Sequence, residues 1–301
     1  MMFFRWACGL VGLVLFGVVY AHPQSDTGRY ETPDAKPLRV VVLEYSFLDA
    51  VVLAGISPVG IADDRRAQRI LPVIRAQLGP YQSVGLRGQP DLETIASLQP
   101  DLIIADRFRH RAIYDKLQAI APTQLLLSYG AEYGTLLEEA RKIGRALGRE
   151  ARVERALHQH QLTMDRYAVQ LQRTVRDERM LFAVTSHKSV TLHGSHAFAS
   201  GVLRRLGLNN AAPSNDNRAY IPVGLEQLAG INPDWLLLGD YVSRQGGSDI
   251  LKRWRQHPVW AYLTATKRQQ IVQVDPNAWS LGRGIHAAEL IASDLLVAVQ
   301  H

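Results

Sequence analysis

The chain has 301 residues with 47% hydrophobic and 21% charged residues, which predicts a soluble globular protein long enough for two domains. A formal charge of +6 is a mild excess, expected either of a cleft that accepts anions or of a basic surface without a ligand. Basic residues do not form a dense run with interleaved aromatics, which argues against a nucleic-acid partner.

The N-terminus has the pattern of a secretory signal peptide. Arg5 precedes an apolar run from Leu10 to Val19, and Ala21 is a small residue suited to cleavage. The run is shorter than the roughly 20 residues of a membrane span, which favours cleavage over an uncleaved anchor. Cys8, the only cysteine, lies within this leader, so the mature chain would have neither disulfides nor thiol chemistry.

The first half of the mature chain alternates between strands and helices. After a polar, proline-rich lead-in at 22–37, we expect a buried strand at 39–43 and a helix at 47–54, capped by Ser46. Further strands are predicted at Val59–Ala62, Leu102–Ala105 and Gln124–Leu127. This order is typical of a mostly parallel sheet with helices on its faces.

A long helix is predicted in the middle of the chain. Apolar residues recur every three or four positions from Val153 to Val175, without an intervening Pro or Gly. A helix of roughly 25 residues would be about 35–40 Å long. It could simply pack on one lobe, or it could join two lobes as a rigid strut.

The second half begins again with a buried strand, Met180–Val184. Strands near Val190–Leu192, Trp235–Leu238 and Ile271–Val274 follow, and a helix at 284–299 ends the chain.

A short motif occurs once in each half. Leu92-Glu93 followed by Pro100-Asp101 returns in the same register as Leu225-Glu226 followed by Pro233-Asp234. Each copy predicts a short helix, a break at Pro-Asp and then a buried strand. The repeat favours two similar α/β lobes with the long helix between them.

With these motifs the chain resembles the periplasmic substrate-binding proteins of ABC importers for iron–siderophores and cobalamin. Within that family it looks most similar to ferric dicitrate-binding proteins, through stretches such as Val42-Leu-Glu-Tyr-Ser-Phe47 and Pro58-Val-Gly-Ile-Ala-Asp-Asp64. The resemblance implies two Rossmann-like α/β lobes, one interlobe helix and a ligand cleft between the lobes. The predicted segments are a signal peptide (1–21), a flexible lead-in (22–37), an N-terminal lobe (38–147), the linking helix (148–176) and a C-terminal lobe (177–301).

The repeated glutamates are candidates for docking. In the family, one surface acid on each lobe meets arginine pockets of the permease, and Glu93 and Glu226 match those positions. Two separated charges on a rigid body would fix its orientation during encounter. A solvated helix face, or an acid that suits the first turn of a helix, is the alternative for either residue alone.

Arginines in the predicted loops are candidates for ligand binding, because Arg recognises carboxylates through paired donors. Ligands of parallel α/β sheets bind beyond the carboxyl ends of the strands. Five arginines fall in such loops: Arg69, Arg87, Arg109, Arg218 and Arg283. Their neighbours Arg65, Arg66, Arg107 and Arg111 could replace some of them. Asp106 could hold one of them in place.

Aromatic residues near the same loops could line the cleft with flat walls or hydroxyl donors. The candidates are Tyr45, Tyr220 and Trp279, whereas Trp235 and Trp254 are expected in the core. The histidines lack the spacing of a metal site, so neither a metal nor another cofactor is expected, and iron would arrive as a chelate. Walker, dinucleotide-binding and nucleophile-elbow motifs are absent, so the ATPase would be a separate chain.

These features predict a monomeric, non-enzymatic periplasmic receptor that passes an anionic ferric chelate, first of all ferric dicitrate, to an ABC permease. Another siderophore or haem is the alternative ligand. A metal-cofactor chelatase or oxidoreductase is the alternative of another class, and its mark would be a cysteine or a cluster of histidine ligands.

Overall fold

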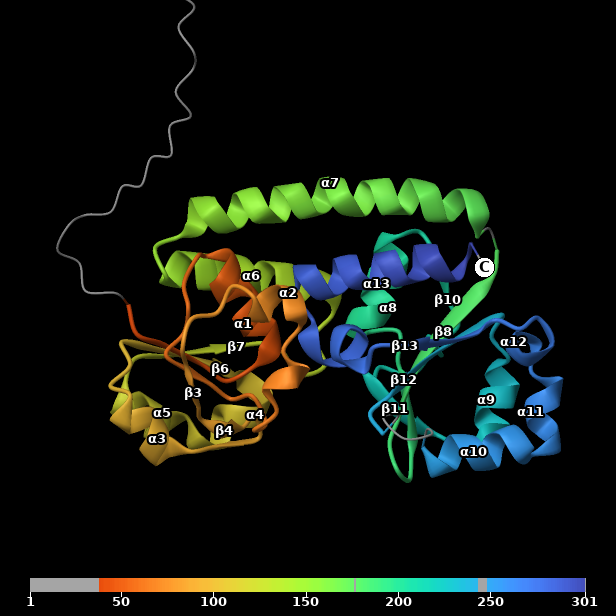
Figure 1. The fold of residues 1–301 in the computed structure, drawn as a ribbon, viewed down its shortest axis with the longest axis horizontal. Coiled ribbons are helices and arrows are strands. Elements are labelled where there is room, and N and C mark those ends of the chain that lie inside the picture. The colour runs from red at the N-terminus through yellow and green to blue at the C-terminus, as the bar shows by residue number, and fades with distance from the viewer. Residues whose placement is uncertain (1–37, 176, 243–247, 301) are drawn as a thin grey trace, which may run out of the picture. The chain divides into compact units, whose positions relative to one another are not determined.

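The computed structural model describes residues 38–175, 177–242 and 248–300, and residues 38–301 form one compact unit. The predicted leader and lead-in lie outside the described residues. Two main sheets are present, and the long helix lies between them in the chain (Figure 1). The fold is therefore α/β with two sheets, as the sequence predicts.

The first sheet is wholly parallel, in the order β3-β2-β1-β6-β7. Its strands are Gln82–Ser83, Gly60–Ile61, Val40–Val42, Leu102–Asp106 and Thr123–Leu126. The central strand β1 is an unbroken run of buried valines, the pattern expected of a strand covered on both faces. Helix α1 (Tyr45–Leu53) follows β1 directly, and a short hairpin, β4 (Gly85–Leu86) and β5 (Gln89–Pro90), follows β3.

The second sheet is mixed, in the order β11-β9-β8-β12-β13. Its strands are Tyr220–Val223, Val190–His193, Arg179–Thr185, Trp235–Asp240 and Ile271–Val274. Strands β8, β12 and β13 are parallel, and β10 (Asn209–Asn210) also pairs with β8 in parallel. Strand β9 is antiparallel to β8, because a tight turn at Ser186–Ser189 joins the two. Strand β11 in turn is antiparallel to β9. The sheet is thus parallel mainly on one side of β8.

Helices cover both sheets. Those of the first half are α2 (Pro72–Arg75), α3 (Leu92–Ser97), α4 (Arg107–His110), α5 (Tyr114–Ile120) and α6 (Tyr133–Ala146). Those of the second half are α8 (Phe198–Arg205), α9 (Leu225–Ile231), α10 (Asp249–Gln256), α11 (Pro258–Tyr262), α12 (Thr264–Lys267) and α13 (Ile285–Ala298), with a π-helical turn at Asn277–Gly282.

The long helix predicted from the sequence is α7, Glu150–Thr174, with 25 residues. Its buried side includes Val153, Leu157, Met164 and Leu171, which confirms the predicted apolar stripe. Helix α7 packs against α6 and α13, as Figure 1 shows. Within the described residues, no helix is long and apolar enough to cross a membrane.

One apolar core joins the two halves. A single cluster of buried residues runs from Phe47 of α1 through Met164 of α7 to Phe182 of β8 and Trp279 of the π-helical turn. Because this packing is continuous, the two lobes are joined by a shared core as well as by α7. The lobe boundaries at 147 and 177 remain predictions.

The repeated motif forms the same structure twice. Gln99 (φ 46°) and Asn232 (φ 45°) each take a left-handed conformation that ends a short helix just before the proline. Asp101 then accepts the backbone N–H of Arg39 at 2.7 Å, and Asp234 accepts that of Arg179 at 2.8 Å. Each aspartate therefore fixes the start of the central strand beside it, which explains why Pro-Asp recurs.

Candidate functional site

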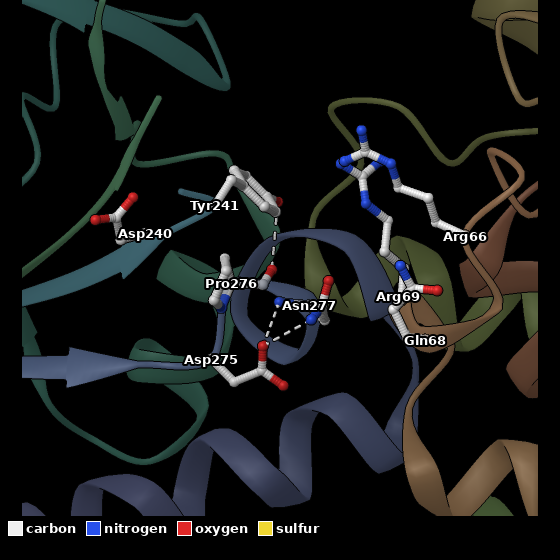
Figure 2. Close-up of a pocket in the computed structure, with 8 residues that line it drawn as sticks. All are labelled: Arg66, Gln68, Arg69, Asp240, Tyr241, Asp275, Pro276 and Asn277. Carbon is white, nitrogen blue, oxygen red and sulfur yellow. Dashed lines mark hydrogen bonds between the residues drawn. The ribbon is translucent and has the colours of Figure 1, made fainter. Parts of the chain in front are cut away.

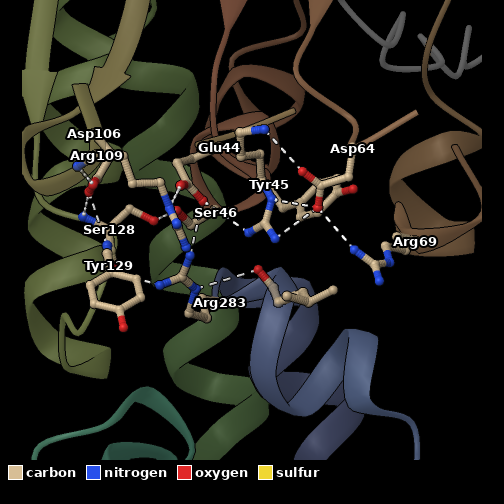
Figure 3. A network of polar contacts seen from close by, with 12 residues as sticks. Glu44, Tyr45, Ser46, Asp64, Arg69, Asp106, Arg109, Ser128, Tyr129 and Arg283 are labelled. Carbon is tan, nitrogen blue, oxygen red and sulfur yellow. Dashed lines mark hydrogen bonds and ion pairs between the residues drawn. The ribbon is translucent and has the colours of Figure 1, made fainter. Parts of the chain in front are cut away.

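Four arginines of separate chain segments gather where the strands of the first sheet end. Arg69 lies beyond β2, Arg87 follows β4, Arg109 belongs to α4 beyond β6, and Arg283 follows the π-helical turn of the second half. We call these four residues the arginine cluster. Figure 3 shows Arg109 and Arg283 pointing toward the same acid, Glu44.

Glu44 is the centre of the arginine cluster. It lies between β1 and α1, and its side chain is fully buried. Its Oε2 accepts from Arg283 at 3.0 Å and from Arg87 at 3.4 Å. Arg109 Nε lies 2.5 Å from Oε1, a close ion pair without hydrogen-bond alignment. A buried carboxylate thus holds three guanidinium groups of both halves of the chain.

Asp64 is the second acid of the cluster. Its Oδ2 accepts two hydrogen bonds from Arg87, at 2.9 and 3.0 Å, and one from Arg69 at 3.0 Å. Burial alone would raise the pKa of Asp64, but these hydrogen bonds and the charges of both arginines outweigh it and lower that pKa. Burial likewise opposes the charge of Arg87, and Glu44 and Asp64 more than compensate, so the pKa of Arg87 is raised. Asp64 and Arg87 therefore each favour the charged form of the other.

Arg283 reaches the cluster through a strained turn. Its backbone is left-handed (φ 47°), and only 2% of the residue is exposed. Its guanidinium donates to the carbonyl of Ser128 at 2.7 Å as well as to Glu44. Ser46 lies inside α1 and bonds the hydroxyl of Ser128 at 2.7 Å. The prediction that Ser46 caps this helix is therefore wrong, because Glu44 occupies the N-cap position.

A hollow of about 440 Å³ lies over the cluster. Its wall combines Arg87, Arg109 and Tyr129 of the first half with Tyr220, Ser280 and Arg283 of the second, and we call it the arginine hollow. Tyr129 stacks on exposed Phe108 and lies 5.2 Å from the ring of Tyr220, so aromatic rings cross from one half to the other. The volume is within the range of about 300–1,000 Å³ common for small-molecule sites.

A second hollow of about 400 Å³ adjoins Arg69. Figure 2 shows Arg66 and Arg69 on one side and Asp240 and Asp275 on the other. Asp240 accepts from the backbone of Val242 and Ser248, and Asp275 from Asn277. These two carboxylates weaken the attraction of this hollow for an anion. The arginine hollow therefore suits an anionic ligand better.

Tyr45 and Tyr220 lie at the site in different roles. Tyr45 is buried under the cluster, with Arg87 over its ring at 4.6 Å, and its hydroxyl donates to the carbonyl of Asp63 at 2.7 Å. Burial raises the pKa of Tyr45 well above its ordinary value. Tyr220 lines the hollow.

Three predicted residues lie elsewhere or act otherwise. The Arg218 side chain is 64% exposed and pairs with Asp216, outside the cluster. Trp279 is 0% exposed and lies in the core, where its Nε1 donates to Asp294 at 2.8 Å, so it does not form a wall of the hollow. Asp106 accepts backbone N–H groups of Arg109, Ser128 and Tyr129 and so shapes the loops without holding a guanidinium.

The remaining predictions concern surface charges and metals. Arg65, Arg66, Arg107 and Arg111 are exposed, and the ion pairs of Glu44 and Asp64 are formed by the arginine cluster instead. Glu93 and Glu226 are exposed in the first turns of α3 and α9. Over the described ranges, no group of His, Cys, Asp and Glu side chains has the arrangement of a metal site.

The residue pattern of the loops does not single out four further residues of the site: Glu44, Asp64, Ser128 and Tyr129. A signal existed for the two acids, since each follows an apolar strand at the edge where ligands of parallel sheets bind. No local pattern marks Ser128 or Tyr129. Ser128 belongs to the site because it accepts from Arg283, which is distant in sequence, and Tyr129 because it contacts Arg109, which follows another strand.

Comparisons with known proteins agree with this geometry. The periplasmic binding protein family matches residues 40–278. The chain belongs to this family. It is 42% identical over 300 residues to the Fe(3+) dicitrate-binding periplasmic protein FecB of Escherichia coli K12, covering 99% of this chain and 97% of that protein. It is 35% identical over 301 residues to the Fe(3+)-citrate-binding protein YfmC of Bacillus subtilis, covering 95% and 93%.

Solved structures share the fold. Staphylococcus aureus SirA complexed with staphyloferrin B matches with a TM-score of 0.76 and 23% identity, covering 88% of this chain and 94% of that one. FhuD of Vibrio cholerae with bound Fe3+–Desferal matches with a TM-score of 0.74 and 22% identity, covering 88% and 98%. The predicted two-lobed fold with a long helix is confirmed. The family consists of substrate-binding transport proteins, and homologues are periplasmic proteins or lipoproteins.

Proposed function

We propose that this chain is a non-enzymatic receptor that captures an anionic ferric chelate, first of all ferric dicitrate, in the arginine hollow. The observation that carries the proposal is the convergence of Arg87, Arg109 and Arg283 on one hollow lined by both halves of the chain. The 42% identity to FecB over nearly the whole chain supports ferric dicitrate as the ligand.

The chemistry of the hollow suits such a ligand. Guanidinium groups bind carboxylates through paired, charge-assisted hydrogen bonds, which are roughly twice as strong as neutral ones. Tyr129 and Tyr220 add hydroxyl donors and flat walls. Iron is the cargo of this binding site and arrives already chelated, so no protein ligand to the metal and no resident cofactor are needed.

Delivery would use the two repeated glutamates. Glu93 and Glu226 lie exposed in equivalent places of the two repeats, where each could meet a basic pocket of a permease subunit. We place the receptor in the periplasm as a monomer, after cleavage of the leader at residue 21.

The proposal is tested by titrating the purified mature protein while its tryptophan fluorescence is followed. Ferric dicitrate should bind saturably with a Kd of about 1 μM or tighter, equivalent to about −8 kcal/mol. Iron-free citrate should bind at least about tenfold more weakly, because it fills less of the hollow. Binding of haem or of a neutral hydroxamate siderophore, with no response to ferric dicitrate, would contradict the proposal.

A further inference from the structure

Glu44, the acid at the centre of the arginine cluster, has no role in the proposed function so far. Among the described residues, Glu44 alone forms ion pairs with three of the four arginines. Its backbone is extended at the end of β1, and its carbonyl accepts the N–H of Leu48 in α1. The side chain therefore leaves a rigid strand–helix junction and is held below the hollow.

The contacts of Glu44 join both halves of the chain. Arg87 comes from the turn between β4 and β5 and Arg109 from α4, both in the first half, whereas Arg283 comes from the turn before α13. Without the carboxylate, three guanidinium groups would face one another at a site where solvent screens them poorly. Like charges so placed would spread apart. Glu44 thus fixes the positions of the arginines before any ligand binds.

Glu44 also limits the charge of the site. The four arginines are offset by Glu44 and Asp64, which leaves an excess of two positive charges below the hollow. Two more acids lie close by but outside these ion pairs. Asp63 accepts from the hydroxyls of Ser83 and Tyr81, and Asp106 accepts the backbone N–H groups of Arg109, Ser128 and Tyr129. Two citrates bring six carboxylates and one Fe3+ offsets three of their charges, so ferric dicitrate is at least as anionic as one free citrate, and net charge alone does not favour the chelate. Fixed guanidinium groups from both halves of the chain favour it instead, because its carboxylates can meet several arginines at once, whereas a single citrate fills less of the hollow.

We propose that Glu44 is a positioning residue that pre-arranges Arg87, Arg109 and Arg283 and limits the positive charge of the hollow, and that this fixed arrangement of arginines selects iron-loaded chelates over iron-free citrate. The selection rests on the proposed function, since it assumes a ferric chelate as the ligand. The pre-arrangement belongs to the unliganded protein and holds for any occupant.

The test compares the wild type with Glu44→Gln, which keeps the shape and removes the charge. Titrations with ferric dicitrate and with iron-free citrate are run across a series of salt concentrations. We expect ferric dicitrate to bind about tenfold more weakly and its preference over citrate to shrink by a similar factor, because the arginines are no longer held. The dependence of log Kd on log salt should steepen, because the site carries one more positive charge.

Two further variants separate positioning from folding. Glu44→Asp keeps the charge on a shorter side chain, so its salt dependence should match the wild type although its affinity falls. Glu139→Gln is the matched control, since Glu139 is also a buried carboxylate paired with a cation, Lys142, but lies on α6 away from the hollow. It should change thermal stability without changing either Kd or the salt dependence.

A readout without ligand completes the test. NMR order parameters of the arginine Nε–H groups should report rigid side chains for Arg87 and Arg283 in the unliganded wild type and increased motion in Glu44→Gln. Unchanged order parameters together with an unchanged salt dependence would overturn the inference. A wild-type protein that binds no ferric chelate would overturn the proposed function and the selection, and the order parameters would still decide the positioning.

Discussion

At the scale of single residues, the site depends on which arginines have a buried acid beside them. Arg109 has a side chain that is 24% exposed, contacts Glu44 and lies over the ring of Tyr129 at 4.7 Å. Arg218 also lies in a loop, but its bidentate partner Asp216 is on the same exposed loop. The exposed pair is screened by water, so it adds little field to the hollow.

This difference predicts opposite results for two similar substitutions. Arg109→Ala should weaken ferric dicitrate binding by about tenfold or more, because one charge-assisted contact is worth roughly 1.5–3 kcal/mol. Arg218→Ala should change Kd by less than about twofold. Both values come from the same fluorescence titration. Equal losses in the two variants would mean that the ligand does not sit in the arginine hollow.

The sequence predicts arginines at loop positions, but it does not predict which of them meet. Arg87, Arg109 and Arg283 differ from Arg218 only through residues that are distant in the chain, such as Glu44 at the end of β1. Trp279 shows the same limit, since a tryptophan next to a loop fits a cleft wall and a core equally well. Its partners Asp294 and Phe182 decide for the core.

At the scale of elements, periodicity and breakers predict most of the fold. Helix α7 follows from its uninterrupted apolar stripe, and the Pro-Asp motifs mark two equivalent helix-to-strand junctions. The antiparallel β9 and β11 could not be predicted in the same way, because strand direction depends on the Ser186–Ser189 turn and on pairing across the sheet.

A buried polar contact ties α1 to α13 across the two halves. Asp49 of α1 accepts from the backbone N–H of His286 at 3.2 Å and lies 3.1 Å from its Nδ1. Burial alone would lower the pKa of His286, but the hydrogen bond and charge of Asp49 outweigh it and raise that pKa above its ordinary value. The folded protein therefore binds this proton more tightly than the unfolded chain does.

The raised pKa of His286 determines how its contribution to stability changes with pH. A raised pKa adds stability that is fully present below the unfolded value of about 6.5 and is lost as pH rises through the folded value. Urea unfolding near pH 5.5 and near pH 8.5 should show that His286→Gln loses more free energy of unfolding at the lower pH. In a protein that already contains Asp49→Asn, the loss caused by His286→Gln should be the same at both pH values. A loss that is the same at both values would contradict the role of Asp49.

At the scale of the whole molecule, one apolar core joins the two halves of the described chain. Phe182 and Trp279 of the second half pack in the same cluster as Phe47 and Leu48 of α1. Close-packed cores resist continuous deformation, so a large hinge motion would break this packing. The proposed receptor would therefore present both lobes to a membrane partner in a nearly fixed arrangement.

A nearly fixed arrangement of the lobes would hold the charges of Glu93 and Glu226 at a constant separation, as docking to two permease subunits requires. Glu93→Arg combined with Glu226→Arg should leave the Kd for ferric dicitrate unchanged, because neither residue lines the hollow. The same protein should fail to support uptake of radioactive iron in cells that carry the cognate permease, because both charges at the docking face are reversed. Each single variant should retain partial uptake.

The control is Glu150→Arg, which also reverses an exposed glutamate in the first turn of a helix, α7. Each reversal loses a favourable interaction of about 0.3–1 kcal/mol with the helix dipole, so all the variants should stay folded by thermal unfolding. Glu150→Arg should transport normally. If the double variant also transports normally, the repeated glutamates are only solvated helix faces, and the motif recurs solely because Pro-Asp fixes the two central strands.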